Sequence, residues 1–258
     1  TGVWTASGAI GNVNTLLAAL TFTPAANFNS NFSITTSVSD GIAAALTGSK
    51  AFTGIPVNDP PTASNLSAAE TYTEDTALNL TDIVVADVDN TNTTATLTLS
   101  SAAAGSLNTG TSGAVTSTYN AGTGVWTASG AIANVNTLLA GLTFTPTVNF
   151  NSNFSIATSV SDGIAAAVTG SKAFTGIPVN DAPTLGNLSA AETYTEDTAL
   201  NLVDIVVADV DNANTTATLT LSSAGAGSLN TGTSGAVTST YNAGTGVWTA
   251  SGAIIDVN

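Results

Sequence analysis

Apolar and polar residues alternate along much of the chain, and this pattern predicts β-strands with one buried face. Ala95, Leu97 and Leu99 alternate with threonines, and a similar alternation runs from 154 to 160. A period of two residues is that of a strand. The period changes between 132 and 142, where apolar residues fall on one face of a short helix. The pattern therefore predicts a β-sandwich with one short helical crossover.

Turn-forming residues divide the rest of the pattern into short segments. Asn120-Ala121-Gly122 predicts a hairpin between residues 115–119 and 125–128. The other predicted extended segments, in chain order, are 71–75, 78–85, 95–99, 142–146, 154–160 and 165–179. Together these make about seven or eight strands in one unit, which predicts an all-β fold.

The whole pattern repeats with a period of 122 residues. Residues 1–136 aligned on 123–258 differ at 14 of 136 positions. A unit of this length can bury its own core, so we predict a string of domains rather than a solenoid of small units. We expect a segment of a longer array. Its predicted domains are the C-terminal part of one repeat at 1–58, a complete repeat at 62–180 and the N-terminal part of a third at 184–258.

Acidic residues are concentrated in two regions of the chain. The net charge is −15, although only 7% of the residues are charged. Residues 1–39 and 90–161 contain no charged residue, whereas acids cluster in 59–89 and 162–211. A salt-adapted acidic surface would spread its acids over every face, but a metal-loaded joint would concentrate them. The chain lacks Cys, His, Met and Arg, which excludes disulfides and thiolate sites and disfavours zinc.

The two acidic regions surround short connectors that are rich in proline. Residues 55–62 read Ile-Pro-Val-Asn-Asp-Pro-Pro-Thr, and residues 177–184 nearly repeat them. Proline fixes its own φ and favours an extended conformation in the residue before it. Asn and Asp supply hard oxygen atoms, and calcium takes about 6–8 oxygen ligands. The connectors therefore predict hinges between β-domains that calcium locks.

Three motifs, taken together, resemble a cadherin repeat. They are Asp-Val-Asp at 87–89, Asp-Gly at 162–163 and Val-Asn-Asp-Ala-Pro at 179–183. The run from 142 to 163 is also similar to the cadherin-like tandem repeats of large bacterial surface proteins and adhesins. The resemblance covers the whole period. It implies tandem cadherin/Ig-like Greek-key β-sandwich domains, with calcium bound between successive domains.

The resemblance also implies which residues bind calcium. The strand-start Glu of the family corresponds to Glu74 and Glu196, and its late Asp corresponds to Asp40 and Asp162. The other implied ligands, from the Asp-x-Asp motif and the linker, are Asp87, Asp89, Asp209, Asp211, Asn58, Asp59, Asn180 and Asp181. At the first joint we expect a meeting of Asn58, Asp59, Asp87, Asp89 and Asp162. At the second joint we expect a meeting of Glu74, Asn180, Asp181, Asp209 and Asp211.

Two departures from the family pattern predict a reduced set of ligands. Pro56 and Pro178 stand where the family linker begins with Asp, and residues 90–161 lack the acid of the vertebrate mid-domain motif. We therefore expect fewer calcium ions per joint than in the full family set. The alternative is that these acids are solvated turn residues, because Asp and Asn form turns readily.

Other function classes have little support in the sequence. Without His or Cys there is no His-based triad or thiol nucleophile, so we do not expect an enzyme. Asp82 with Asp87 and Asp89 could mimic a catalytic carboxylate pair, but these acids belong to the connector motif. An acidic chain repels nucleic acid, and no apolar run has the length of a membrane-spanning helix.

The leading interpretation is a calcium-stiffened structural repeat, a spacer or stalk in an extracellular bacterial surface protein or adhesin. Its expected partners are neighbouring repeats of the same or an identical chain. The alternative is a subunit of a self-assembling extracellular filament, because residues 1–58 and 184–258 would together make one sandwich. A sandwich with unpaired edges needs either more chain or a neighbouring subunit.

A further alternative is a carbohydrate-binding module. The large aromatics are spaced too irregularly for a sugar-binding platform, and we expect them in the core; they are Trp126, Phe144, Phe150, Phe154 and Phe174. A surface glycan is a separate expectation, because Asn-x-Ser/Thr sequons permit glycosylation in an exported protein. The sequons begin at Asn31, Asn65, Asn79, Asn92, Asn153, Asn187 and Asn214.

Overall fold

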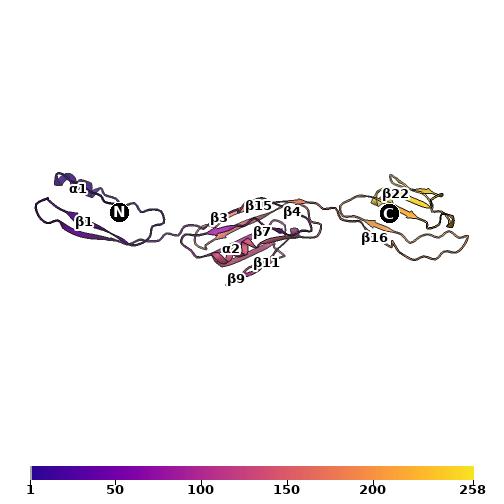
Figure 1. The fold of residues 1–258 in the computed structure, drawn as a ribbon, viewed down its shortest axis with the longest axis horizontal. Helices are drawn as coiled ribbons and strands as arrows, with labels where there is room; N and C mark the ends of the chain where they lie inside the picture. Colours follow the sequence, from indigo (N-terminus) through magenta and orange to yellow (C-terminus); the bar gives the residue numbers. More distant parts are fainter. Residues whose placement is uncertain (1) are drawn as a thin grey trace.

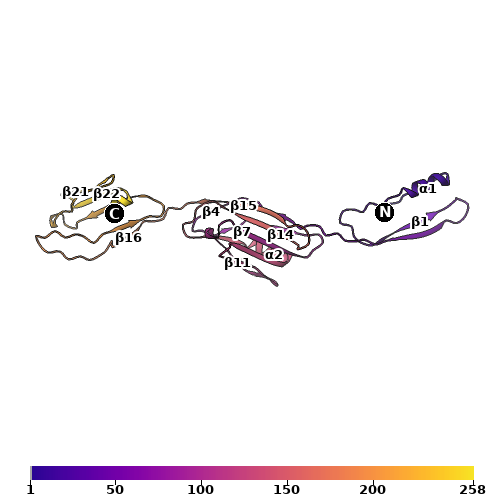
Figure 2. The same cartoon turned by 180° about the vertical axis from the view of Figure 1, so that it is seen from behind.

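The computed structural model describes residues 2–258 and shows three bodies arranged along one axis (Figures 1 and 2). The N-terminal and C-terminal bodies lie at opposite ends of the rod, with a central body between them (Figure 1). Single extended connectors join the bodies. None of the helices in residues 2–258 has the length and apolarity that a membrane crossing requires.

The central body is a two-layered β-sandwich. One layer is a six-stranded sheet with the order β11-β12-β7-β14-β15-β4. Against it pack the three-stranded sheet β5-β13-β8 and the pair β3-β6, while helix α2, Ile132–Ala140, crosses from β12 to β13. The strands are β3 Thr62–Ser64, β4 Glu70–Thr73, β5 Leu78–Asn79, β6 Val84–Ala86, β7 Asn92–Leu99, β8 Gly105–Leu107, β9 Thr111–Ser112, β10 Val115–Thr116, β11 Thr118–Asn120, β12 Val125–Ala131, β13 Thr143–Pro146, β14 Phe154–Ser161 and β15 Val168–Ile177.

The two end bodies contain the same elements in part. The N-terminal body has helix α1, Ile10–Ala18, and a hairpin of β1, Phe32–Val38, with β2, Leu46–Phe52. In the C-terminal body, β18, β22 and β21 pair as β7, β12 and β11 do in the centre. Its elements are β16 Thr184–Gly186, β17 Val206–Ala208, β18 Asn214–Thr220, β19 Thr233–Ser234, β20 Val237–Thr238, β21 Thr240–Asn242, β22 Val247–Ala253 and α3 Ile254–Val257. One-turn 3-10 helices occupy Ala102–Ala104 and Ala224–Ala226.

The core of the central sandwich is built around aromatic rings, as their spacing predicted. Trp126 is fully buried, and its Nε1 donates a 3.0 Å hydrogen bond to the carbonyl of Asn108. Phe144 and Phe174 are also buried, with their rings 5.6 Å apart across the two layers. Phe150 and Phe154 pack against this core while partly exposed. These five aromatics therefore form no platform on the surface of the central sandwich.

The predicted all-β sandwich with one helical crossover is confirmed, but one local prediction was wrong. Residues 78–85 do not form one strand, because the chain leaves β5 in one sheet before it joins β6 in another. β4 pairs in parallel with β15, with Phe174 opposite Glu70 and Ile177 opposite Thr73. Periodicity along one strand carries no information about the direction of its neighbour, so the sequence did not reveal this pairing.

A charged pair lies inside the apolar core beside that parallel pairing. Lys172 of β15 is completely buried, and its Nζ lies 2.8 Å from Glu70 Oε1 and 3.0 Å from the carbonyl oxygen of Thr81. The same Glu70 oxygen accepts a 2.8 Å hydrogen bond from the Thr81 backbone N–H. The charges and polar groups of this cluster satisfy one another, which a buried ion pair requires.

Replacing Lys172 with methionine should lower the free energy of unfolding of the central sandwich by about 3–5 kcal/mol, because Glu70 would keep a buried charge without its partner. Chemical denaturation monitored by Trp fluorescence measures this change. Adding Glu70→Gln should recover much of the loss. Lys50→Met is the control, because Lys50 is exposed in this structure. Equal losses in the Lys172 and Lys50 variants would contradict the prediction.

Candidate metal centres at the two joints

The acidic loop of each joint is folded by its own first aspartate. Asp87 Oδ1 accepts hydrogen bonds from the backbone N–H groups of Asp89, at 2.9 Å, and Asn90, at 2.8 Å. Asp209 holds Asp211 and Asn212 in the same way. A short acidic side chain commonly closes a turn by this contact. One oxygen of each aspartate is thereby used within the loop, and the second oxygen of Asp87 is buried without a hydrogen-bond partner.

At the first joint, the connector 55–62 meets this loop. The backbone N–H of Asp59 donates a 2.7 Å hydrogen bond to Asp89 Oδ2. Asn58 Nδ2 donates at 2.7 Å to Asp162 Oδ2, which comes from the turn after β14. Three segments far apart in the sequence therefore converge. Hydrogen bonds link the five residues expected at this joint, some of them through Asn90, but their carboxylates do not form a cluster close enough to hold a metal ion.

The second joint repeats the arrangement with the loop 209–212. The Asp181 N–H donates a 2.6 Å hydrogen bond to Asp211 Oδ2. Glu74, only 1% exposed, accepts a hydrogen bond from the Val179 N–H through Oε1. This contact follows from the parallel pairing, which places the end of β4 beside the end of β15. Connector, loop and preceding domain all contribute side chains here.

Two asparagines that we did not predict complete the joints. Asn90 Nδ2 donates to Asn58 Oδ1 at 2.6 Å, and Asn212 Nδ2 donates to Asn180 Oδ1 at 2.6 Å. Asn90 also lies 3.4 Å from Asp162 Oδ2. Each of these asparagines directly follows the Asp-Val-Asp motif. Their position beside the motif was the signal that could have identified them.

Asp40 and Glu196 lie outside both joints. Asp40 is the repeat counterpart of Asp162 and makes the same turn, in which Oδ1 accepts 2.9 Å hydrogen bonds from Ile42 and Ala43. That turn stands at the tip of the β1–β2 hairpin, at the opposite end of β2 from the connector. Glu196 is the exposed counterpart of Glu74. The structure therefore brings neither residue to the first or the second joint.

The joints contain buried carboxylate oxygens without a hydrogen-bond partner. In residues 2–258 there are three such buried side-chain atoms: Glu74 Oε2, Asp87 Oδ2 and Asp181 Oδ2. All three belong to residues predicted to bind calcium. Leaving a buried polar group unsatisfied is costly, and more so for a charged group. These oxygens are therefore free to take a cation.

Carboxylates alone do not assemble a metal centre at either joint. Within residues 2–258, no three Asp, Glu, His or Cys side chains are grouped closely enough to hold a metal ion. Amide and backbone oxygens must therefore supply part of any ligand set, which suits calcium because it accepts them readily.

One aspartate at each joint has a shifted pKa, and the two shifts have opposite directions. Burial raises the pKa of Asp181, and the negative charges of Asp211, Asp75, Glu74 and Asp209 raise it further. At the first joint, the amide of Asn58 lowers the pKa of Asp162, with help from the backbone N–H groups of Ile164 and Ala165. Asparagine donors thus stabilise one carboxylate, whereas the crowding of acids destabilises the charged form of the other.

Asp89→Ala should speed hydrogen exchange of the Asp59 amide about tenfold, because that amide loses its charged acceptor. The amide of Asp181 should be unaffected. Asp211→Ala should have the converse effect, so each variant is the control for the other. Amide exchange followed by NMR gives both rates. If either variant changed the exchange rates of both the Asp59 and the Asp181 amides, the effect of these aspartates would not be confined to their own joint.

Comparisons with known proteins identify neither a family nor a function for this chain. No protein-family model matches the chain, and no curated protein matches it. Among solved structures, PcdhgB3 EC1-4 is 12% identical over 87% of this chain, with a TM-score of 0.36. The chain spans 49% of that structure, about half its length.

Two surface proteins are also among the similar structures. Domains 4–9 of the surface layer protein SbsC are 13% identical over 85% of this chain and 30% of theirs, with a TM-score of 0.23. The BspA C-terminal domain from Streptococcus agalactiae is 9% identical over 87% and 84%, with a TM-score of 0.21. At these identities no function passes from either protein to this chain. With TM-scores below 0.5, these likenesses carry no argument about this chain, whose fold is the two-layered β-sandwich described above.

Proposed function

We propose that this chain is a structural repeat of an extracellular bacterial surface protein or adhesin, stiffened by calcium at the joints between its domains. The observation that supports this most directly is the set of three unpartnered, buried carboxylate oxygens on Glu74, Asp87 and Asp181. All three lie where two domains meet. The near-identity of the repeats suits a spacer, because equal copies add length without adding new recognition surfaces.

At the first joint the side chains that would hold calcium are Asn58, Asp59, Asp87, Asp89 and Asp162. At the second joint they are Glu74, Asn180, Asp181, Asp209 and Asp211. When bound, calcium supplies a double positive charge that offsets the mutual repulsion of these carboxylates. The amides of Asn58 and Asn180 would turn their Oδ1 atoms from the neighbouring asparagine toward the ion.

The protein's own contribution to stiffness is already visible at the connectors. Pro56, Pro60 and Pro61 limit the conformations of the first connector. Asp59 is fixed to Asp89 through its backbone, so the connector is held at the point where the next domain begins. Such a rod would keep a distal binding domain away from the cell surface. The role needs no catalytic group, and we propose none.

Calcium should raise the midpoint of thermal unfolding of the 258-residue chain, because an ion that binds only the folded state stabilises it by mass action. At a free concentration of about 100 times the dissociation constant, the gain is about 2.7 kcal/mol. Differential scanning calorimetry with calcium, with chelator and with magnesium measures it. Calcium titration calorimetry gives the stoichiometry.

The variant Asp87→Asn with Asp181→Asn removes one unpartnered oxygen from each joint and should abolish most of this gain. Asp82→Asn together with Asp204→Asn makes the same change of charge at two exposed acids and serves as the control. The distance between the two end bodies, measured by fluorescence energy transfer, should also increase in calcium, and the distribution of that distance should become narrower. The proposal would be refuted if the unfolding midpoint and the end-to-end distance were both the same in calcium and in chelator.

A further inference from the structure

Strand β6 leads directly into the acidic loop 87–90, but only one of its edges is paired with another strand. On that edge β3 runs antiparallel to it, with Ala63 opposite Val85. Among residues 2–258, no strand pairs with the other edge. Val85 is only 2% exposed, so its backbone N–H and C=O groups need partners other than water. A partner from outside the sheet must therefore hold the end of β6.

Asn136 of helix α2 supplies that partner with a single side chain. Its Oδ1 accepts a 2.9 Å hydrogen bond from the Val85 N–H, and its Nδ2 donates a 2.9 Å hydrogen bond to the Val85 carbonyl oxygen. A carboxamide presents an acceptor and a donor side by side, as the peptide groups of a neighbouring strand do. Asn136 therefore takes the place of a further strand, and it binds β6 two residues before Asp87.

Helix α2 also holds the chain on the far side of the acidic loop. The backbone N–H of Ile132, at the start of the helix, donates a 2.9 Å hydrogen bond to the carbonyl oxygen of Thr91. Thr91 directly follows Asn90, the last residue of the loop. The helix itself is fixed by Val135 and Leu139, which are both buried in the core. One rigid element thus holds the chain before and after the acidic loop.

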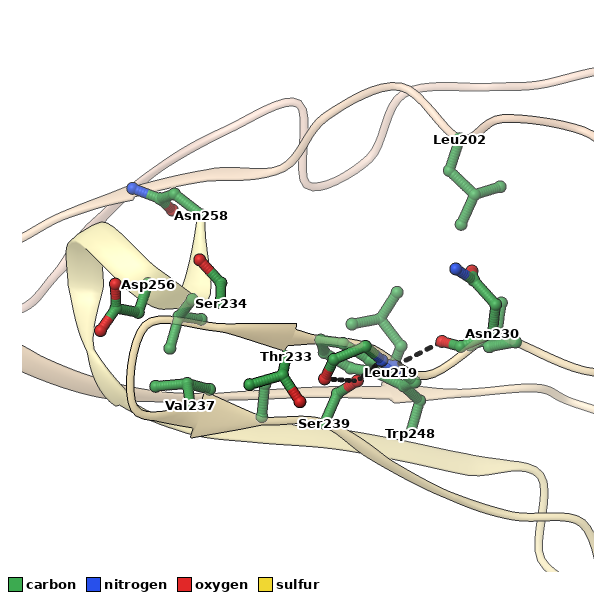
Figure 3. A pocket seen from close by; sticks show the side chains of 14 residues that line it. Leu202, Leu219, Asn230, Thr233, Ser234, Val237, Ser239, Trp248, Asp256 and Asn258 are labelled. Atoms are coloured by element: carbon green, nitrogen blue, oxygen red, sulfur yellow. Dashed lines mark hydrogen bonds between the residues drawn. The ribbon is translucent and has the colours of Figure 1, made fainter.

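The second joint repeats both contacts. Asn258 Oδ1 accepts a 2.8 Å hydrogen bond from the Val207 N–H, and Asn258 Nδ2 donates a 2.9 Å hydrogen bond to the Val207 carbonyl oxygen. Figure 3 shows Asn258 at one end of a pocket, with its amide turned toward the neighbouring segment of the chain. On the far side of the loop, the Ile254 N–H donates a 2.7 Å hydrogen bond to the carbonyl oxygen of Ala213. The loop 209–212 is therefore held as the loop 87–90 is.

The two helices make this contact although their sequences differ beside it. Residues 132–136 read Ile-Ala-Asn-Val-Asn, whereas residues 254–258 read Ile-Ile-Asp-Val-Asn. Asn134 contacts another part of the body, because its Oδ1 accepts a 3.3 Å hydrogen bond from the Ser112 hydroxyl of β9. The central helix thus carries two asparagines, of which one holds the acidic loop and the other serves as its matched control.

The acidic loop needs a support because its carboxylates repel one another. Asp87 and Asp89 share the first joint with Asp59 and Asp162, and like charges that lie close together favour an open arrangement when no cation is bound. Asp87 Oδ2 is buried without a hydrogen-bond partner, so no donor holds that oxygen in place. Groups that orient metal ligands from outside the ligand set typically change metal affinity about 10–100-fold. A contact that fixes β6 can therefore set how well the joint binds a cation.

We infer that Asn136 is a positioning residue for the calcium site of the first joint, and that Asn258 has the same role at the second joint. Each asparagine holds the strand that enters the acidic loop, so that the Asp-Val-Asp carboxylates stand in place before a cation arrives. Neither asparagine is a ligand, because both polar groups of its side chain are bound to a valine backbone. The inference rests on the proposed function, since it assigns a cation to these loops.

Amide exchange of the full chain in chelator, followed by NMR, tests the positioning without calcium. Asn136→Ala should speed exchange of the Asp89 and Asn90 amides about tenfold, because the loop that these amides close would lose its support. The amides of the loop 209–212 should keep their rates. Asn134→Ala removes the other asparagine of the same helix and should leave both loops unchanged. Equal rates in the Asn136 and Asn134 variants would overturn the inference.

A titration with calcium chloride tests the link to the metal. The chemical shifts of the Asp59 and Asp181 amides report binding at the first and the second joint separately. Asn136→Ala should weaken binding at the first joint about tenfold and leave the second unchanged. Asn258→Ala should do the converse, and it tests the same contact if the Asn136 variant does not fold. Ile156→Ala truncates a buried residue of β14 and controls for general destabilisation, so both affinities should stay unchanged.

The two measurements separate this inference from the proposed function. Equal losses of calcium affinity in the Asn136→Ala and Ile156→Ala variants would reduce Asn136 to a general structural role and overturn the inference, while calcium binding by the unsubstituted chain would still support the proposed function. If the unsubstituted chain bound no calcium, the proposed function would be rejected. The exchange rates in chelator would then still decide whether Asn136 positions the loop.

Discussion

The parallel pairing of β4 with β15 joins an early strand of the central sandwich to its last strand, and both ends of the domain depend on it. Because the two strands run in the same direction, the chain enters at one end of the sandwich and leaves at the other, and an elongated rod results (Figure 1). The same pairing sets Glu70 beside Lys172 in the core and Glu74 beside Val179 at the exit. The β4–β15 pairing therefore both stabilises the core of the domain and places the carboxylate of Glu74 at the next joint.

The joints concentrate negative charge where two domains meet, and the protein offsets that charge in two ways. Asparagine amides and backbone N–H groups donate to some of the carboxylate oxygens, as Asn58 does to Asp162. The oxygens left over, such as Asp87 Oδ2, have no donor of their own. This division explains why a joint can hold its shape through hydrogen bonds and still offer ligands to a cation.

Two kinds of contact would thus act along the same axis. The joints couple whole domains through hard oxygen atoms, whereas the interior of each sandwich couples its two halves through aromatic rings and a buried ion pair. The coupling inside the sandwich is the more selective of the two, because one lysine must pair with one glutamate among otherwise uncharged residues. In the central sandwich this pair is Lys172 of β15 and Glu70 of β4.

The sequence alone was enough to predict the all-β class, the short helix after β12, the aromatic core and ten of the residues that gather at the joints, but it also included Asp40 and Glu196, which lie elsewhere, and missed Asn90 and Asn212. These features depend on local periodicity or on motifs that keep their partners at fixed positions, such as Asp87 and Asp89 beside the connector. Only the tertiary structure decided the parallel pairing of β4, the burial of Lys172, the bridging role of Asn90 and which carboxylate oxygens lack a partner. Each of these depends on segments far apart in the chain meeting in one register, and the pattern along a single strand does not encode its neighbour.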